Sequence, residues 1–440
     1  MSKYHIITFG CQMNERDSEY IAGTLETMGY TSTENMEDAD IIFLNTCTIR
    51  EKAENKALSL LGGLRKNKKN NPDLIIGVAG CLSQQEGKAK KIASSLKHVD
   101  IILGTHNLHE LSGMLKKVLQ KEGQQLNVWD KEGEVFEGMT DSQAYPFKSL
   151  INIIYGCNNF CTYCIVPYVR GRERSRKPES IVNEIINKVD NGVKEVMLLG
   201  QNVNSYGKDF EDSKYSFADL IRELNNIQGL ERIRYMTSHP RDFNDELIKA
   251  ISESPKVTDH FHLPVQSGSD KILKKMNRGY TKEYYLDLIK KIREIRPNAA
   301  ITTDIIVGFP GETEKDFQDT VDLVNEVRFA SAFSFMYSPR KGTPATEFQE
   351  QVPLKEKKDR IHMLNKIINE HELIYNKNLD NVVLSCLIEG KYKGKEKLIG
   401  KTSGYRSVIV DGPESLIGEV VDVLITDSSK QLKGKVIQEG

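Results

Sequence analysis

The sequence has no apolar run of about 18 residues, so it offers no membrane-spanning helix. Its first residues, Met1 to Phe9, contain no long apolar core and no cleavage site, so we predict no secretion signal and expect a cytoplasmic protein. Acidic and basic residues nearly cancel, leaving a net charge of −1, and no overall charge therefore attracts nucleic acid. Any RNA binding has to come from local basic patches.

Cysteine is scarce, with seven residues, and an odd number excludes a complete disulfide framework. In a reducing compartment, clustered cysteines are more often metal ligands. Six of the seven form two sets of three. The tight set lies in one short run and consists of Cys157, Cys161 and Cys164. The dispersed set is spread over the first part of the chain and consists of Cys11, Cys47 and Cys81. Three thiolates are one short of a closed four-ligand site, so each set suggests a metal cluster with one open position.

Residues 1–125 alternate short apolar runs with helical segments, which predicts a doubly wound parallel sheet. The expected strands are Lys3–Phe9, Asp40–Leu44, Leu74–Ala79 and Val99–Leu103. Each cysteine of the dispersed set comes just past one of the first three. Because the carboxyl ends of parallel strands share one edge, these cysteines should converge into a site. The alternative is three buried thiols that act only as small hydrophobic side chains.

The remaining chain divides into three segments. Residues 126–142 are polar and predict a linker. Residues 143–376 repeat the strand–helix pattern and predict a partial (β/α)6 TIM-type barrel, with its site at the C-terminal ends of the strands. Residues 377–440 hold about five short alternating strands, typical of a small all-β barrel of the OB type. The expected fold is therefore a multidomain α/β protein.

The tight set reads C-x3-C-x2-C, a spacing that lets one loop surround several irons of an iron–sulfur cluster. A structural zinc site is the alternative, but zinc prefers four ligands. No histidine lies between His109 and His239 to supply the fourth.

With Tyr163 before its last cysteine, the tight set resembles the motif of radical S-adenosylmethionine (SAM) enzymes, where three cysteines hold a [4Fe-4S] cluster whose open iron binds SAM. The order of the domains resembles the radical SAM methylthiotransferases, and the last barrel resembles their RNA-binding TRAM domain. Five segments resemble the tRNA-2-methylthio-N6-dimethylallyladenosine synthase branch: Gly10–Asn14, Asp17–Glu19, Asn45–Lys52, Gly156–Arg176 and Gly200–Ser205.

The resemblance implies two [4Fe-4S] clusters and two SAM molecules per turnover. The cluster on the dispersed set would carry the sulfur, which one SAM methylates. A second SAM would be cleaved at the tight set, and the 5′-deoxyadenosyl radical would take hydrogen from C2 of N6-isopentenyladenosine at position 37 of tRNA. An aromatic C–H bond resists polar chemistry, which explains the need for a radical cofactor. The methylthio group would then join C2.

The implied partners are the anticodon stem-loop of tRNA, an electron donor such as flavodoxin or ferredoxin, and proteins that assemble clusters or carry sulfur. The chain itself is expected to be a monomer. Two other enzyme functions stay open: methylthiolation of threonylcarbamoyladenosine in tRNA, or of ribosomal protein S12. A third alternative is an RNA-binding scaffold whose clusters are only structural.

Candidate contacts to SAM sit mainly at predicted strand ends, although each could simply serve packing or a turn: Tyr163, Gly200, Gln201, Ser238, Gln266, Arg278, Asp304 and Gly308. Candidate RNA contacts come from two basic runs, one directly after the tight set and one in the last barrel: Arg170, Arg172, Arg174 and Arg176, with Lys391, Lys393 and Lys395. The alternative for both runs is a solvated charged face.

Overall fold

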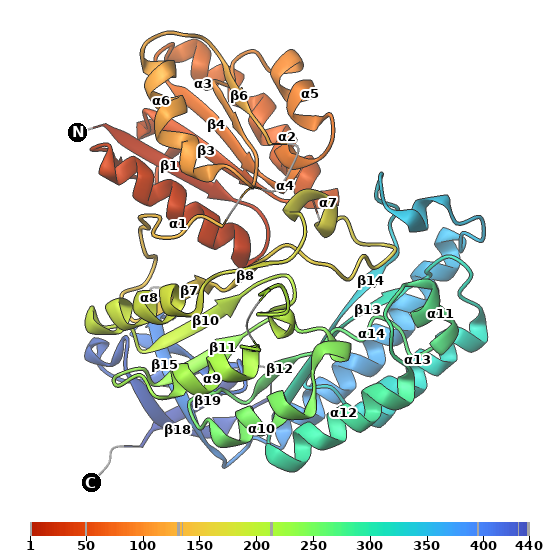
Figure 1. Ribbon diagram of the computed structural model, residues 1–440. Helices are drawn as coiled ribbons and strands as arrows, with labels where there is room; N and C mark the ends of the chain where they lie inside the picture. Colours follow the sequence, from red (N-terminus) through yellow and green to blue (C-terminus); the bar gives the residue numbers. More distant parts are fainter. Residues whose placement is uncertain are drawn as a thin grey trace.

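A computed structural model of the chain describes residues 2–48, 51–129, 133, 135–211, 214–393, 396–429 and 431–437. Lys395, a predicted RNA contact, lies outside them. The N-terminal domain stands at the top of Figure 1, above a central α/β domain and a C-terminal barrel drawn in blue. No helix in the described ranges is both long and apolar enough to cross a membrane.

The N-terminal domain is a parallel sheet of six strands in the order β2-β1-β3-β4-β5-β6. Its strands β3 and β4 are buried along their whole length, as expected when helices cover both faces. The strands are β1 Lys3–Thr8, β2 Thr31–Ser32, β3 Ile41–Thr46, β4 Ile75–Gly80, β5 Ile101–Leu103 and β6 Gln125–Asn127. The helices are α1 Gln12–Thr27, α2 Glu51–Gly63, α3 Arg65–Asn70, α4 Cys81–Gln84, α5 Lys88–Ser95 and α6 Leu111–Leu119. Because β6 pairs with β5, the sheet extends two residues past position 125.

The central domain is the expected partial barrel of six parallel strands. It is built from two three-stranded sheets, joined where Ile233 bridges to Val257. Its strands are β7 Lys148–Asn152, β10 Glu195–Leu199, β11 Arg232–Tyr235, β12 His260–His262, β13 Ala300–Val307 and β14 Ser331–Met336. The short ribbon of β8 Ile154–Tyr155 and β9 Arg174–Ser175 carries the loop of the tight set.

Helices follow the strands of the central domain and cover its outer side (Figure 1). They are α8 Pro178–Asp190, α9 Phe217–Asn225, α10 Asp245–Glu253, α11 Asp270–Lys275, α12 Lys282–Ile295, α13 Glu314–Val327 and α14 Leu354–Lys377. The short helix α7 Val166–Arg170 lies instead against α4 of the N-terminal domain (Figure 1). The apolar faces of α8, α9, α10, α12 and α13 join the strands in one continuous core. The fold class expected for this part of the chain is confirmed.

The C-terminal unit is a closed barrel in the order β15-β16-β17-β19-β18, which confirms the small all-β barrel. Its strands are β15 Val383–Lys391, β16 Lys397–Thr402, β17 Ser407–Asp411, β18 Val420–Asp427 and β19 Leu432–Val436. Alternate residues such as Cys386, Val408 and Val423 fill its interior. Cys386 is therefore a packed thiol.

The turn between β16 and β17 inserts into the N-terminal end of the central barrel. The Tyr405 ring stacks on His260 with ring centroids 5.1 Å apart, and the buried Arg234 guanidinium lies 4.7 Å from the Tyr405 centroid. Arg234 also donates to the Ser403 carbonyl at 3.1 Å, and the Ser403 hydroxyl donates to Asp259 at 2.8 Å. The C-terminal barrel thus forms part of the floor of the central barrel.

Arg16 joins the N-terminal domain to the central domain. Its side chain is 1% exposed and reaches three carboxylates: Glu19 on its own helix, Asp141 of the connecting segment and Glu184 on α8. The pairs with Glu19 and Glu184 measure 2.8 and 2.6 Å. The start of α1, directly after Cys11, is therefore fixed to the central domain by charge.

Candidate functional site

The dispersed set forms at the carboxyl edge of the N-terminal sheet, where the sequence predicted it. Cys11 precedes the first residue of α1, Cys47 directly follows β3, and Cys81 follows β4 as the first residue of α4. Burial raises the pKa of Cys81 to about 11; Arg170 opposes that rise, and Cys11 and Cys47 add to it. The three thiols are thus electrostatic neighbours around one arginine.

Two glycines let the backbone approach closely at this edge. Gly80 has φ +98°, and an added Cβ would lie 2.4 Å from the Thr46 carbonyl oxygen. Gly10 has φ +138°, and its Cβ would lie 2.8 Å from the side chain of Asn14. Because a larger residue would displace the neighbouring strand or Asn14, glycine is required before Cys11 and Cys81.

The tight set lies on a folded loop after β8. The Cys157 amide donates to the Gly171 carbonyl at 3.1 Å, and the Cys164 amide donates to the Cys161 carbonyl at 2.9 Å. Burial raises the pKa of Cys164 to about 12, and Cys161 and Cys157 add to the rise. Burial also raises the pKa of Cys157 to about 11. These three thiols are therefore a second group of mutual neighbours.

The donor chemistry of both sets, three cysteine thiols, fits an iron–sulfur cluster. Within the described ranges, no three His, Cys, Asp or Glu side chains are placed to hold one metal ion. Yet the thiols of each set are near enough to affect one another's charge. A cluster of several irons needs thiolates spread in this way, because each thiolate binds a different iron.

Arg278 touches the tight set. Its Nη1 donates to the Cys161 sulfur at 3.4 Å, its Nη2 donates to the Pro264 carbonyl at 2.6 Å, and its Nε donates to the Tyr280 hydroxyl at 3.0 Å. None of these three partners is a carboxylate. Arg278 therefore brings a buried positive charge beside Cys161 that can also meet an anionic group of a ligand.

Three non-glycine residues with left-handed backbone lie at the same face. Phe160, inside the loop of the tight set, has φ +45°, Thr237 after β11 has φ +66°, and Gln266 after β12 has φ +71°. Non-glycine residues in this region cost about 1–3 kcal/mol each and concentrate at functional sites. The three strained positions surround the C-terminal ends of the barrel strands, where a TIM-type barrel carries its site.

Buried polar atoms without a partner mark a ligand site at these strand ends. They are Asn152 Oδ1, Gln201 Oε1, Ser238 Oγ, His239 Nε2 and both amide atoms of Asn204. Buried polar groups normally find a partner, so this concentration indicates a polar ligand. Gln201 and Ser238 were predicted SAM contacts. Asn152 and Asn204 were not, although Asn204 lies in the family-like segment Gly200–Ser205. Gly200 itself packs tightly, because a Cβ there would lie 2.4 Å from Ile154.

The other predicted SAM contacts lie around the same face. Tyr163 is partly buried against Phe309, with ring centroids 6.5 Å apart, and burial raises its pKa well above the usual range. The backbone N–H of Gln266 donates to the backbone carbonyl of Asp304 at 2.9 Å. The Asp304 carboxylate is 30% exposed and lies 3.6 Å from His262 Nε2. Asp304 and Tyr163 are thus both partly accessible at this face.

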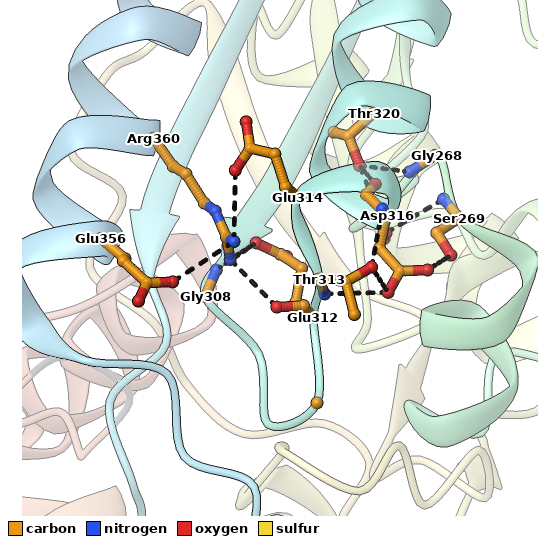
Figure 2. A network of polar contacts seen from close by, with 12 residues as sticks. Gly268, Ser269, Gly308, Glu312, Thr313, Glu314, Asp316, Thr320, Glu356 and Arg360 are labelled. Carbon is orange, nitrogen blue, oxygen red and sulfur yellow. Dashed lines mark hydrogen bonds and ion pairs between the residues drawn. The ribbon is translucent and has the colours of Figure 1, made fainter.

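Gly308 belongs to a braced turn, shown in Figure 2. Its amide donates to Glu312 Oε1 at 2.9 Å, and Arg360 of α14 donates to the same oxygen at 2.9 Å. In the neighbouring turn, Asp316 accepts from the Ser269 hydroxyl at 2.7 Å. The loops after β12 and β13 are therefore tied to each other and to α14, which holds the strand-end face rigid.

The basic run after the tight set divides into buried and accessible arginines. Arg170 and Arg176 were predicted RNA contacts, and this is corrected because they are only 4% and 3% exposed. Arg170 pairs with Asp17 at 2.6 Å, and Arg176 pairs with Glu184 at 2.7 Å. Arg172 is exposed, and its guanidinium lies 5.1 Å from the Phe160 ring centroid.

Three other predicted RNA contacts have accessible side chains. Arg174 is half-buried and donates to the Gly133 carbonyl at 2.6 Å. Lys391 and Lys393 are exposed on the C-terminal barrel; Lys391 pairs with Glu414 at 2.6 Å, and Lys393 lies 5.2 Å from the Tyr392 ring centroid. Lys391 and Lys393 can reach a phosphate or a base with little rearrangement, whereas Arg174 would first have to release the Gly133 and Arg170 carbonyls.

A cavity of about 660 Å³ lies between all three units but away from the strand-end face. Gln12 beside Cys11, Leu150, Met197 and Tyr405 are among its lining residues, and so are several glutamates, including Glu15 and Glu195. This acidic cavity at the N-terminal ends of β7 and β10 does not suit a polyanion. The strand-end face is the better site for the chemistry.

Comparison with protein families divides the chain as the fold does. The radical SAM superfamily matches residues 151–324, the uncharacterized protein family UPF0004 matches residues 3–104, and the TRAM domain matches residues 383–437. The three matched segments lie in the central domain, the N-terminal domain and the C-terminal barrel.

Curated relatives match nearly the whole chain. The tRNA-2-methylthio-N(6)-dimethylallyladenosine synthase of Pelotomaculum thermopropionicum is 54% identical over 428 residues, covering 97% of this chain and 95% of the relative. The protein of the same name from Alkaliphilus oremlandii is 52% identical over 439 residues, covering 99% and 93%.

Solved structures share the fold at much lower identity. The radical SAM methyltransferase TsrM from Kitasatospora setae, with cobalamin and a [4Fe-4S] cluster bound, has a TM-score of 0.58 and 12% identity. The match covers 79% of this chain and 77% of TsrM. The cobalamin-dependent radical enzyme OxsB has a TM-score of 0.52 and 15% identity, covering 83% and 56%.

Proposed function

We propose the function of this chain from one premise: it belongs to the family of the tRNA-2-methylthio-N(6)-dimethylallyladenosine synthases, within the radical SAM superfamily. The chain is a radical SAM methylthiotransferase that adds a methylthio group to C2 of N6-isopentenyladenosine at position 37 of tRNA. Its relatives' shared name favours this substrate over threonylcarbamoyladenosine and over a ribosomal protein.

One observation carries the proposal: two sets of three neighbouring thiols stand on either side of the short helix α7, and each set is one ligand short. The radical SAM match supports one [4Fe-4S] cluster and SAM, and we propose that the tight set holds this cluster. We propose a second [4Fe-4S] cluster on the dispersed set, and two SAM molecules per turnover. When bound, these groups supply the radical that removes hydrogen and the sulfur that is transferred.

The residues of the strand-end face bind and orient SAM. Gln201 and Ser238 offer unpartnered buried oxygens to its polar groups, and Arg278 places a positive charge beside Cys161, where the SAM carboxylate needs one. The braced turns after β12 and β13 keep this face from adjusting to other ligands. Preorganised polar groups of this kind orient the reacting atoms.

RNA reaches the site through accessible basic side chains. We propose that Arg172 and Arg174 beside the tight set, and Lys391 and Lys393 on the C-terminal barrel, contact the anticodon stem-loop. Position 37 lies in a loop, where a base can be turned out of its stack towards the site. The TRAM-domain match supports the role of the barrel. A small reductase such as flavodoxin or ferredoxin, and cluster-assembly or sulfur-carrier proteins, complete the proposed set of partners.

Mass spectrometry of tRNA nucleosides from a deletion strain tests the function. We expect the 2-methylthio group to disappear from isopentenylated adenosine and to return with the wild-type gene, but not with Cys161→Ala or Cys81→Ala. Unchanged tRNA together with a modified ribosomal protein would overturn the proposal. Anaerobic iron analysis tests the cofactors: about eight irons per chain are expected, and about four would remove the second cluster.

A further inference from the structure

The short helix α7 connects the two sets of cysteines. It begins two residues after Cys164; Ile165, its N-cap residue, and Val169 pack with Cys81 in one buried cluster. The Thr105 hydroxyl of the N-terminal domain donates to the Val169 carbonyl at 2.7 Å. The segment that leaves the tight set therefore ends against the dispersed set (Figure 1).

Arg170, the last residue of α7, extends into the shell of the dispersed set. Its Nη2 lies 2.6 Å from Asp17 Oδ2 and donates to Asn14 Oδ1 at 3.4 Å. The side chains of Arg170 and Asp17 are 5% and 4% exposed. Asn14 Oδ1 also accepts from the Cys11 sulfur at 3.6 Å. Arg170 thus stands one polar side chain from Cys11, and its charge also acts on Cys81.

Stability alone does not explain why the ion pair between Arg170 and Asp17 is buried. Desolvation cancels most of the attraction in a buried salt bridge, and well-packed apolar residues often stabilise a protein as much or more. The placement of this pair against thiolates supplies a reason, because nearby charge and hydrogen bonds set the reduction potential of an iron–sulfur cluster. A cation stabilises the more negative, reduced state, and a carboxylate offsets the cation.

We propose that Arg170 is a positioning residue that sets the charge at the dispersed set, with Asp17 as its opposing charge, and so tunes the reduction potential of the cluster held there. This inference rests on the proposed function, which supplies that cluster. The two residues have opposite effects: Arg170 shifts the potential to more positive values, and Asp17 limits the shift. If Arg170 and Asp17 only held the chain in place, their substitutions would not shift the reduction potential in opposite directions.

The test uses the full chain with the tight set removed by Cys157→Ala, Cys161→Ala and Cys164→Ala, so that only the second cluster can form. After anaerobic reconstitution, iron content is measured and the potential is followed by electron paramagnetic resonance. We expect Arg170→Gln to shift the potential to more negative values and Asp17→Asn to shift it to more positive values. Arg170→Lys, which keeps the charge, should lie between Arg170→Gln and wild type.

Arg222→Gln is the matched control, because Arg222 pairs with Glu246 and Glu253 away from both sets; its potential should equal that of the parent. Equal potentials for all variants, or shifts of Arg170→Gln and Asp17→Asn in the same direction, would overturn the inference and leave the proposed function intact. If Arg170→Gln takes up no iron, Asp17→Asn alone decides by the sign of its shift. A parent without iron would instead refute the second cluster on which this inference rests, whereas the nucleoside analysis tests the proposed function separately.

Discussion

The two sets of cysteines have the same number of ligands but are built in different ways. The tight set belongs to one loop, whose internal hydrogen bonds involve Gly171 and Cys161. The dispersed set exists only when β1, β3 and β4 are aligned in a sheet. Both have a buried arginine, but Arg170 is matched by Asp17, whereas Arg278 donates to a carbonyl, a hydroxyl and a thiol. A local sequence can encode the first kind of site, while the second depends on the fold.

Single cysteine substitutions should separate the two sets most strongly. Cys161→Ala removes a ligand of the tight set, so both 5′-deoxyadenosine formation and methylthiolation should fall by about a hundredfold or more. Cys81→Ala should abolish methylthiolation but keep 5′-deoxyadenosine formation, because the tight set remains intact. Chromatography with mass spectrometry of both products measures this. Equal loss of both products in the two variants would contradict separate roles.

Arg16→Met should destabilise the region of the dispersed set and spare the tight set. The substitution removes a buried cation that Glu19, Asp141 and Glu184 share. Because Asp141 keeps Lys188 and Glu184 keeps Arg176, the loss should lie at the lower end of the about 3–5 kcal/mol that breaking a buried ion pair costs. Thermal unfolding measures the loss, and iron analysis should show that the second cluster is lost first. Arg222→Met removes a surface ion pair and should change stability by less than about 1 kcal/mol. A similar loss of stability in Arg16→Met and Arg222→Met would mean that the interdomain ion pairs of Arg16 stabilise the protein no more than surface ion pairs do.

The pH dependence of stability should differ between the central domain, which contains Glu312, and the N-terminal domain. Burial raises the pKa of Glu312 from 4.5 to about 7, with Arg360 opposing the rise and Asp316 adding to it. Between pH 4.5 and 7 the folded chain keeps this proton and the unfolded chain loses it. Stability therefore falls as pH rises through that window, by at most about 3 kcal/mol.

Glu312→Gln should remove this slope, because it leaves a neutral side chain at every pH. Denaturant unfolding at several pH values, followed by a probe in the central domain, gives the measurement. A probe in the N-terminal domain should show no slope from this residue. An unchanged slope in the variant would place its origin elsewhere.

Glycine substitutions compare the two sites with equal chemistry. Gly80→Ala puts a Cβ 2.4 Å from the Thr46 carbonyl, and Gly156→Ala puts one 2.0 Å from the Arg172 carbonyl. Each should cost about 1–3 kcal/mol and reduce iron only at its own set. Gly29→Ala is the control, because its φ is +89° but no atom lies within 4 Å of the added Cβ. Loss of both clusters in either variant would show that the sites are not independent.

The smallest effect concerns the arginines after the tight set. Arg172→Gln should weaken tRNA binding by about 1 kcal/mol, reduce the salt dependence by about one charge, and leave stability unchanged. Arg176→Gln should instead lower stability, because Arg176 is buried on Glu137 and Glu184. Filter binding at several salt concentrations and thermal unfolding test both. Equal effects on binding would restore Arg176 as an RNA contact.

Strands and cysteine positions could be predicted because they follow local patterns. Short apolar runs mark β1, β3 and β4, and each cysteine of the dispersed set comes within three residues of a strand end. The sequence pattern over Gln84–Leu96 predicts one helix, but Gln84 is the last residue of α4 and α5 begins only at Lys88, because Gly87 takes φ +73° between them. Local composition did not reveal this break.

The burial of individual charges could not be predicted, because it depends on distant parts of the chain. Arg170 and Arg172 lie in the same basic run of the sequence, yet Arg170 is buried in an ion pair with Asp17 on α1, whereas Arg172 is exposed. The unpartnered amide of Asn204 and the ring of Tyr405 are recognised only when neighbouring strands are in place. Functional polar residues that come together from distant parts of the chain can therefore be identified only from the folded structure.

The turn that carries Tyr405 has a consequence for how the molecule can be divided. Because this ring lies on His260 and its neighbour Ser403 binds Asp259, removing the C-terminal barrel would open the floor of the central barrel. The RNA-binding module is then not an appendage that can be exchanged or trimmed. We expect the two barrels to melt in a single calorimetric transition, and a chain shortened before β15 to lose its catalytic half as well.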